Sequence, residues 1–226
     1  MITRDTQRVC DLIQSRMQPG ARTLVGISGP PASGKSTLAD AVVNAFNQQQ
    51  TSAVPPATLV PMDGYHLDNH VLETRGLLAR KGAPETFDAV GFCAAIKTLA
   101  SAKHECFFPK FDRQMDLAIA NAIAVHPETP VIVVEGNYLL LDKEPWASLN
   151  NLFSATIFVS PTLETLQARL QERWIRHGFD PDSALRRAMR NDIPNAQLVL
   201  RNSQQADLVL NQNGAELGTS IPFADR

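Results

Sequence analysis

Short apolar runs alternate along this chain with longer stretches in which apolar residues recur every three or four positions. The short runs predict buried strands at 23–28, 57–62, 131–134, 155–159 and 207–210. The periodic stretches predict helices at 2–17, 38–46, 89–99, 163–175 and 181–200. Strands that alternate with helices indicate an α/β fold, a three-layer αβα sandwich around a mostly parallel five-stranded sheet.

Two stretches interrupt this alternation. Residues 65–86 are mostly polar and follow the strand at 57–62, and long loops at strand ends often carry function. Residues 101–125 are the least regular part of the chain and suggest a small lobe or a hairpin. The length of 226 residues suits one core, so we interpret residues 1–226 as a single domain.

Composition narrows the classes of function. The chain is 44% hydrophobic and 19% charged, as expected for a soluble globular protein. Its net charge of −2 argues against a nucleic-acid partner, which needs a basic face to neutralise phosphates. The three cysteines have no CxxC spacing, and neither a signal peptide nor an apolar run of about 18 residues is present. We therefore expect a cytoplasmic protein with a small-molecule partner and no membrane partner.

The segment GPPASGKS at 29–36 matches the phosphate-binding pattern G-x-x-x-x-G-K-[ST]. A predicted strand precedes it and a helix follows, so loop amides and the helix N-terminus can bind phosphates. Lys35 can reach the β and γ phosphates, and Ser36 supplies a hydroxyl for Mg²⁺. A glycine-rich turn with an exposed lysine is the alternative, which the flanking strand and helix disfavour. The predicted ATP-binding residues of the loop are Gly29, Ala32, Ser33, Gly34, Lys35, Ser36 and Thr37.

Two carboxylates follow predicted strands. Asp63 and Glu135 fall at carboxyl ends, where open parallel sheets bind ligands. Phosphoryl transfer uses one carboxylate as the base for the acceptor hydroxyl and another for Mg²⁺, so we assign Asp63 to the base and Glu135 to the metal. Asp63 could instead form a turn before Gly64. Glu135 follows a fully apolar run, and burial of its charge would be costly without a partner.

Arginines line one side of the helix predicted at 163–175. Arg169, Arg173 and Arg176 are spaced i, i+4 and i+7, which brings them to one face. Such a stripe suits a lid formed by residues 164–192. The lid would close on ATP and stabilise charge on the transferring phosphoryl group. The alternative is a solvated face paired with Glu164 or Glu172.

Residues between 64 and 125 are candidates for a small acceptor-binding lobe. Their donors and acceptors suit a polyhydroxylated ligand. Phenylalanines in the same region belong more often to a core than to a base-stacking platform. The predicted substrate-binding residues are Tyr65, His66, Lys110, Asp112 and Arg113.

The segments GPPASGKST, PMDGYHLDN, VVEGNYLLL and RLQERWIRHG, in this order, resemble the phosphoribulokinase and uridine kinase family of P-loop kinases. The resemblance runs from about residue 24 to residue 210. It implies a P-loop NTPase fold with a helical lid, ATP and Mg²⁺ as cofactors, and transfer of the γ-phosphoryl group of ATP to a small-molecule hydroxyl. It also implies catalytic roles for Lys35, Asp63, Arg173 and Arg176, ATP binding by Arg169, and metal contacts by Ser36 and Glu135.

Three further segments, RKGAPETFDAVGF, FPKFDR and RNDIPNAQLV, are similar to bacterial proteins labelled fructose transport system kinase. This likeness favours a sugar of the fructose type as acceptor. The segment around FPKFDRQ lacks the aromatic and histidine pair of uridine kinases, which places a nucleoside second, together with pantothenate or nicotinamide riboside. A nucleotide-hydrolysing regulator is a more distant alternative, because no NKxD motif for guanine is present. For the adenine base, the sequence offers Asn202 and the loop before Asp207 as candidate contacts. The sequence leaves the oligomeric state open, with a homo-oligomer as one alternative.

Overall fold

The computed structural model describes residues 3–48 and 53–211. In these residues, five strands form one sheet in the order β2-β5-β1-β6-β7, and every neighbouring pair is parallel. The strands are β1 (Thr23–Ser28), β2 (Ala57–Pro61), β5 (Val131–Gly136), β6 (Ala155–Val159) and β7 (Leu208–Leu210). All five predicted strands are therefore confirmed. Central strands β1, β5 and β6 are buried throughout, which explains their unbroken apolar sequences.

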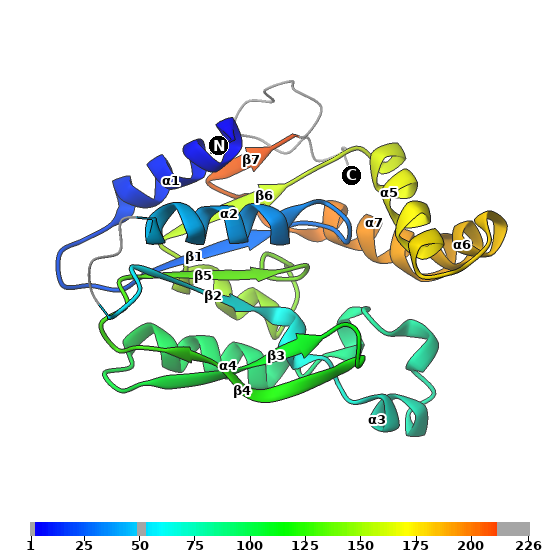
Figure 1. Cartoon of the computed structure of the whole chain (residues 1–226), viewed down its shortest axis with the longest axis horizontal. Helices are drawn as coiled ribbons and strands as arrows, with labels where there is room; N and C mark the ends of the chain where they lie inside the picture. Colours follow the sequence, from blue (N-terminus) through cyan, green and yellow to red (C-terminus); the bar gives the residue numbers. More distant parts are fainter. Residues whose placement is uncertain (1–2, 49–52, 212–226) are drawn as a thin grey trace.

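Helices cover both faces of the sheet (Figure 1). On one face α1 (Arg4–Arg16) and α2 (Lys35–Asn47) bury Val9, Ile13 and Val42 against β1, β5 and β6. On the other face α4 (Ala89–Ser101), the 3₁₀ segment η4 (Trp146–Leu152) and α7 (Ile193–Asn202) share a second core. The predicted three-layer α/β architecture is confirmed. Ile2, the predicted start of the first helix, lies outside the described residues.

The predicted helix at 181–200 contains a change of helical type. It consists of α6 (Pro181–Arg187), the π-helical turn η5 (Ala188–Asp192) and α7. The preceding helix α5 (Leu163–Arg176) packs against all three. Together these elements extend beyond the carboxyl ends of the strands (Figure 1). No helix in the described parts of the chain is long and apolar enough to cross a bilayer.

The two irregular stretches also have defined structure. Residues 62–86 contain η1 (Met62–Tyr65), α3 (Asn69–Thr74), η2 (Leu78–Arg80) and η3 (Pro84–Thr86). The stretch at 101–125 contains β3 (Cys106–Asp112) and β4 (Leu117–Val125), which pair as an antiparallel hairpin, so the suggested hairpin is confirmed. The hairpin contacts η1 directly after β2, which brings its tip toward the carboxyl edge of the sheet.

Candidate active site

Most of the sequence-predicted residues line one cavity of about 1260 Å³, whereas Gly29, Ser33 and Glu135 lie outside its lining. The phosphate loop, η1, the hairpin tip, α5 and η5 each contribute to its lining, beyond the carboxyl ends of β1, β2 and β5. Segments that are far apart in the sequence therefore meet where open α/β sheets bind ligands. Transfer of a group from ATP to a smaller ligand requires one cleft that holds both molecules close together.

The phosphate loop presents its donors to this cavity. Gly34, Lys35, Ser36 and Thr37 line it, and the first turn of α2 has no side-chain cap and no acidic residue. The unpaired amides of a helix N-terminus favour anions, so the site fits the phosphates of ATP. The loop needs unusual backbone angles, with φ of 92° at Gly34 and 63° at Ala32. A left-handed alanine is uncommon and costs energy, as is often seen at functional sites.

Glu135 and Lys35 form the buried ion pair beneath the loop. Lys35 Nζ lies 3.6 Å from Glu135 Oε1, and the two side chains are 10% and 6% exposed. Burial raises the pKa of Glu135, whereas the charge of Lys35 and a hydrogen bond with Ser36 oppose this shift. The charge is thus partly compensated, as the sequence argument required.

Oxygen donors suited to Mg²⁺ gather at the same place. Ser36 and Glu135 are hydrogen-bonded, and Asp63 is close enough for its charge to raise the pKa of Glu135. The described residues contain no group of three histidine, cysteine or acidic side chains placed to bind a metal. Mg²⁺ at phosphoryl-transfer sites is held by one or two carboxylates, water and the phosphates themselves, so this donor set fits.

Asp63 lies in η1 at the border of the cavity. Its Oδ2 accepts a hydrogen bond from Arg113 Nη2 at 3.2 Å, and the arginine side chain is 62% exposed. An ion pair this exposed is weak, so an acceptor hydroxyl can compete for the carboxylate. His66, one turn further, contacts the backbone oxygen of Asp63 through Nδ1 at 2.8 Å. Burial lowers the pKa of His66, which favours the neutral imidazole.

The three arginines of α5 line the cavity but have different partners. Arg169 donates to the carbonyl oxygens of Ala32 and Ser33, both at 3.3 Å, and so joins the helix to the phosphate loop. Arg173 is largely buried, and burial lowers its guanidinium pKa. Arg176 pairs with Glu172 at 3.6 Å, and both side chains are about two-thirds exposed or more. In this structure Arg176 therefore matches the alternative interpretation, a solvated helix face paired with a glutamate.

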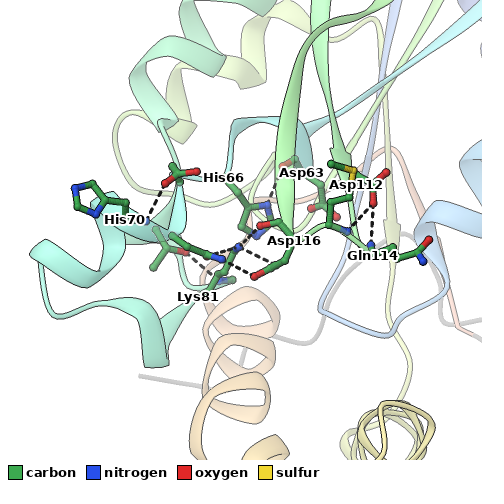
Figure 2. A network of polar contacts seen from close by, with 12 residues as sticks. Asp63, His66, His70, Lys81, Asp112, Gln114 and Asp116 are labelled. Atoms are coloured by element: carbon green, nitrogen blue, oxygen red, sulfur yellow. Dashed lines mark hydrogen bonds and ion pairs between the residues drawn. The ribbon is translucent and has the colours of Figure 1, made fainter.

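Three predicted substrate-binding residues do not line the cavity. Tyr65 packs edge-on against Phe92 with ring centroids 5.1 Å apart, and burial raises the pKa of its hydroxyl to about 12. Lys110 is exposed on β3. Asp112 accepts hydrogen bonds from the backbone N–H groups of Gln114 and Met115, so it caps the hairpin turn (Figure 2). His66 and Arg113 do line the cavity.

A polar network that the sequence did not indicate occupies this part of the cavity (Figure 2). Lys81 Nζ donates to Asn69 Oδ1 at 2.6 Å and to Asp116 Oδ1 at 2.8 Å. The same ammonium lies 5.0 Å from the ring centroid of Phe111, which in turn contacts His66. These residues belong to three separate segments. Asp116 lies in the turn between β3 and β4, where its φ is 55°.

Comparison with known proteins identifies the family of this chain. The model of the phosphoribulokinase / uridine kinase family matches residues 24–217. Among solved structures, the chain is similar to a "putative fructose transport system kinase" from Silicibacter sp. TM1040, with 42% identity, a TM-score of 0.84, and coverage of 91% of this chain and 98% of that one.

Two curated relatives are also similar over most of their lengths. The "Uncharacterized protein YggC" of Escherichia coli is 36% identical over 86% of this chain and 79% of its own. The "Putative uridine kinase C227.14" of Schizosaccharomyces pombe is 31% identical over 84% of this chain and 83% of its own. The phosphate loop, the two strand-end carboxylates and the arginine-bearing helix thus lie inside the matched region, and this chain belongs to the phosphoribulokinase / uridine kinase family of kinases.

Proposed function

We propose that this protein transfers the γ-phosphoryl group of ATP to a hydroxyl of an uncharged, polyhydroxylated small molecule, with fructose as the leading candidate. The observation that carries the proposal is the charge balance of the acceptor end of the cavity. Lys81 is paired with Asp116 at 2.8 Å and Arg113 with Asp63 at 3.2 Å. The likeness to a protein named as a fructose transport system kinase supports the same acceptor class.

The ATP end of the cavity, by contrast, carries several cationic side chains. Lys35, Arg169 and Arg173 line it together with the uncapped start of α2. These donors would bind the β and γ phosphates and stabilise the charge that spreads over the phosphoryl group during transfer. Ser36 and Glu135 would hold Mg²⁺, which supplies charge neutralisation between the β and γ phosphates when bound.

Asp63 is the base in this proposal. It lies between the buried Lys35–Glu135 pair and the hairpin, where a hydroxyl could meet the γ-phosphoryl group. The acceptor hydroxyl would donate to the carboxylate alongside Arg113. It would pass its proton to Asp63 as its oxygen bonds to the γ-phosphorus, while the bond from that phosphorus to the β-phosphate oxygen breaks and ADP leaves. Arg173 on α5 lies within electrostatic reach of both Asp63 and Arg113, so the lid helix faces the same point.

The charge balance separates acceptor classes. A phosphorylated or carboxylate-bearing acceptor would need cations without partners at its end of the cavity. Each of the two cations lining that end has a carboxylate partner among the described residues, and Asn69 adds a neutral amide. Hydroxyl groups can exchange hydrogen bonds with these paired groups without leaving a charge uncompensated.

A nucleoside is the second candidate, favoured by the ring pair of His66 and Phe111. Their centroids lie 4.6 Å apart, and both rings line the cavity. Aromatic faces at this position could stack on a base. Phe111 also lies beneath the ammonium of Lys81, which leaves less of its surface for such a ligand.

A panel of acceptors tests the proposal. ADP release would be measured with ATP, Mg²⁺ and, in turn, fructose, other hexoses and pentoses, uridine, nicotinamide riboside, pantothenate and a sugar phosphate. We expect acceptor-dependent release with an uncharged sugar and none with pantothenate or the sugar phosphate. Lys35→Ala is the control that should abolish the signal. The kinase proposal is wrong if no acceptor raises ADP formation above background hydrolysis.

A further inference from the structure

The π-helical turn η5 joins the two ends of the cavity. It lies between α6 and α7, and two consecutive residues in it, Asn191 and Asp192, line the cavity. Asp192 contacts the lid, whereas Asn191 contacts the segment that carries Lys81. π-helical turns within longer helices are frequent at functional sites, because the extra residue redirects side chains.

The lid contact is a hydrogen bond to α5. Trp174 Nε1 donates to Asp192 Oδ2 at 2.7 Å, and the bond is partly buried. Arg187 lies over the same indole, with 4.3 Å between its guanidinium carbon and the ring centroid. Arg173 precedes Trp174 on α5, and the charge of Asp192 acts on its guanidinium. The position of η5 is thus tied to the position of an arginine that we assign to the phosphoryl group.

The acceptor contact is a pair of hydrogen bonds to residues 80 and 81. Asn191 Nδ2 donates to the carbonyl oxygen of Lys81 at 2.9 Å, and Asn191 Oδ1 accepts from Arg80 Nη1 at 3.0 Å. One residue later, the carbonyl oxygen of Gly82 accepts a hydrogen bond from Tyr138, which lies in the loop after β5. The segment is therefore anchored to the loop after β5 at Gly82 and to η5 at Lys81.

We propose that Asn191 is a positioning residue that couples nucleotide binding under the lid to the placement of Lys81 at the acceptor end. Movement of α5 and η5 must either carry Lys81 along or break its hydrogen bond with Asn191. With its backbone in the present position, Lys81 donates to Asn69 and Asp116. Bound ATP that fixes the lid therefore also holds the acceptor end in its assembled form, and by linkage a bound acceptor favours the lid position that binds ATP.

The inference rests on nucleotide binding at the phosphate loop, so its test measures that binding separately. Amide hydrogen exchange would be followed with and without a non-hydrolysable ATP analogue and Mg²⁺, with no acceptor present. Backbone hydrogen bonds from Lys81 to Leu78 and from Ala83 to Arg80 make the segment a direct reporter of local opening. In the parent protein we expect exchange at residues 78–86 to slow by about fivefold or more on binding, the lower range of coupling between sites.

Asn191→Ala should keep the protection at residues 29–37 and lose it at residues 78–86. Asn191→Asp should do the same, because a carboxylate still accepts from Arg80 but cannot donate to Lys81. Gln171→Ala is the matched control. Its side-chain amide also donates to a backbone oxygen within the lid region, that of Pro181 at 3.2 Å, but does not reach the acceptor segment. It should behave as the parent does.

Two results would overturn the coupling while leaving nucleotide binding intact. One is protection of residues 29–37 without protection of residues 78–86 in the parent protein. The other is equal protection of residues 78–86 in the parent and in both Asn191 variants. A parent protein without protection at residues 29–37 would instead contradict the proposed nucleotide site, and the coupling would fall with it.

Discussion

Lys35 Nζ lies 3.6 Å from Glu135 Oε1, and both side chains are nearly buried under the phosphate loop. A carboxylate in this position has no water to solvate its charge, so it depends on cationic partners. Lys35 is one partner in the structure, and Mg²⁺ is the other in our proposal. The pair links the phosphate loop to the end of β5, and thereby places the metal donor next to the phosphates.

Glu135→Gln tests this metal assignment. The amide keeps the shape of the side chain but loses the charge, so we expect the Mg²⁺ concentration at half-maximal activity to rise by about 10- to 100-fold. The measurement is a Mg²⁺ titration of ADP release at saturating ATP. Glu128→Gln, an exposed position before β5, is the comparison variant and should titrate like the parent protein. Overlapping curves for Glu135→Gln and the parent would show that Glu135 does not contact the metal.

Asp63→Asn tests the base. An amide cannot take the proton of the acceptor hydroxyl, so kcat should fall by about 10²- to 10⁴-fold. The affinity for ATP should change little, since the phosphate donors lie on the loop and on α5. Steady-state kinetics and a separate ATP-binding measurement check both parts. A large loss of ATP binding with modest loss of kcat would instead point to a metal or structural role for Asp63.

Lys81→Met and Lys110→Met separate two assignments of the acceptor-binding lysine. Lys81 lines the cavity with an ammonium bonded to Asn69 and Asp116, whereas Lys110 is exposed outside it. We expect Lys81→Met to raise KM for the acceptor by roughly 10- to 100-fold, the value of a hydrogen bond to a charged group, with KM for ATP nearly unchanged. The effect of Lys110→Met should be smaller. The opposite ranking would restore the assignment made from the sequence.

Asp192→Asn tests the partly buried carboxylate that accepts a hydrogen bond from Trp174. Burial raises the pKa of Asp192 above its ordinary 3.8, so the folded state binds a proton more readily than the unfolded state. Stability from this group is therefore complete below pH 3.8 and declines as the pH rises through the raised folded value. Asparagine still accepts from Trp174 but does not titrate. The Tm of the variant relative to the parent should increase over this pH window.

Thermal unfolding at a series of pH values measures this difference. A Tm difference that is flat from pH 3.5 to pH 7, or that falls, would show that the charges of Arg173 and Arg187 compensate Asp192 fully in the folded protein. Activity is not needed for this measurement, so its outcome is independent of the acceptor.

Much of the fold could be predicted from the sequence because the strongest signals are local. A buried parallel strand needs an unbroken apolar run, so the segments at 23–28, 131–134 and 155–159 were identifiable without knowing their neighbours. Helix boundaries were less certain. The helix after the phosphate loop begins at Lys35 instead of residue 38, since the loop glycine Gly34 at φ 92° is itself its N-cap and carries no apolar signal.

The phosphate loop was predictable for a similar reason, because one continuous segment carries the whole motif. Asp63 and Glu135 were predictable with one more step of reasoning, because the carboxyl ends of parallel strands share an edge of the sheet. Tyr65 shows where this reasoning fails. It follows Asp63 by two residues, but the 3₁₀ turn η1 directs its ring into the core against Phe92.

The sequence by itself determined the class of this protein: a parallel α/β sheet, a phosphate loop, and carboxylates at strand ends, each encoded within a few consecutive residues. Only the tertiary structure decided the polar cluster in which Lys81, Asn69 and Asp116 meet from different segments, and the hydrogen bonds of Asn191 with Arg80 and Lys81. Side chains brought together by chain folding over 35 or 110 residues leave no periodic or spaced pattern in the sequence. Their contacts depend on packing, which local patterns do not specify.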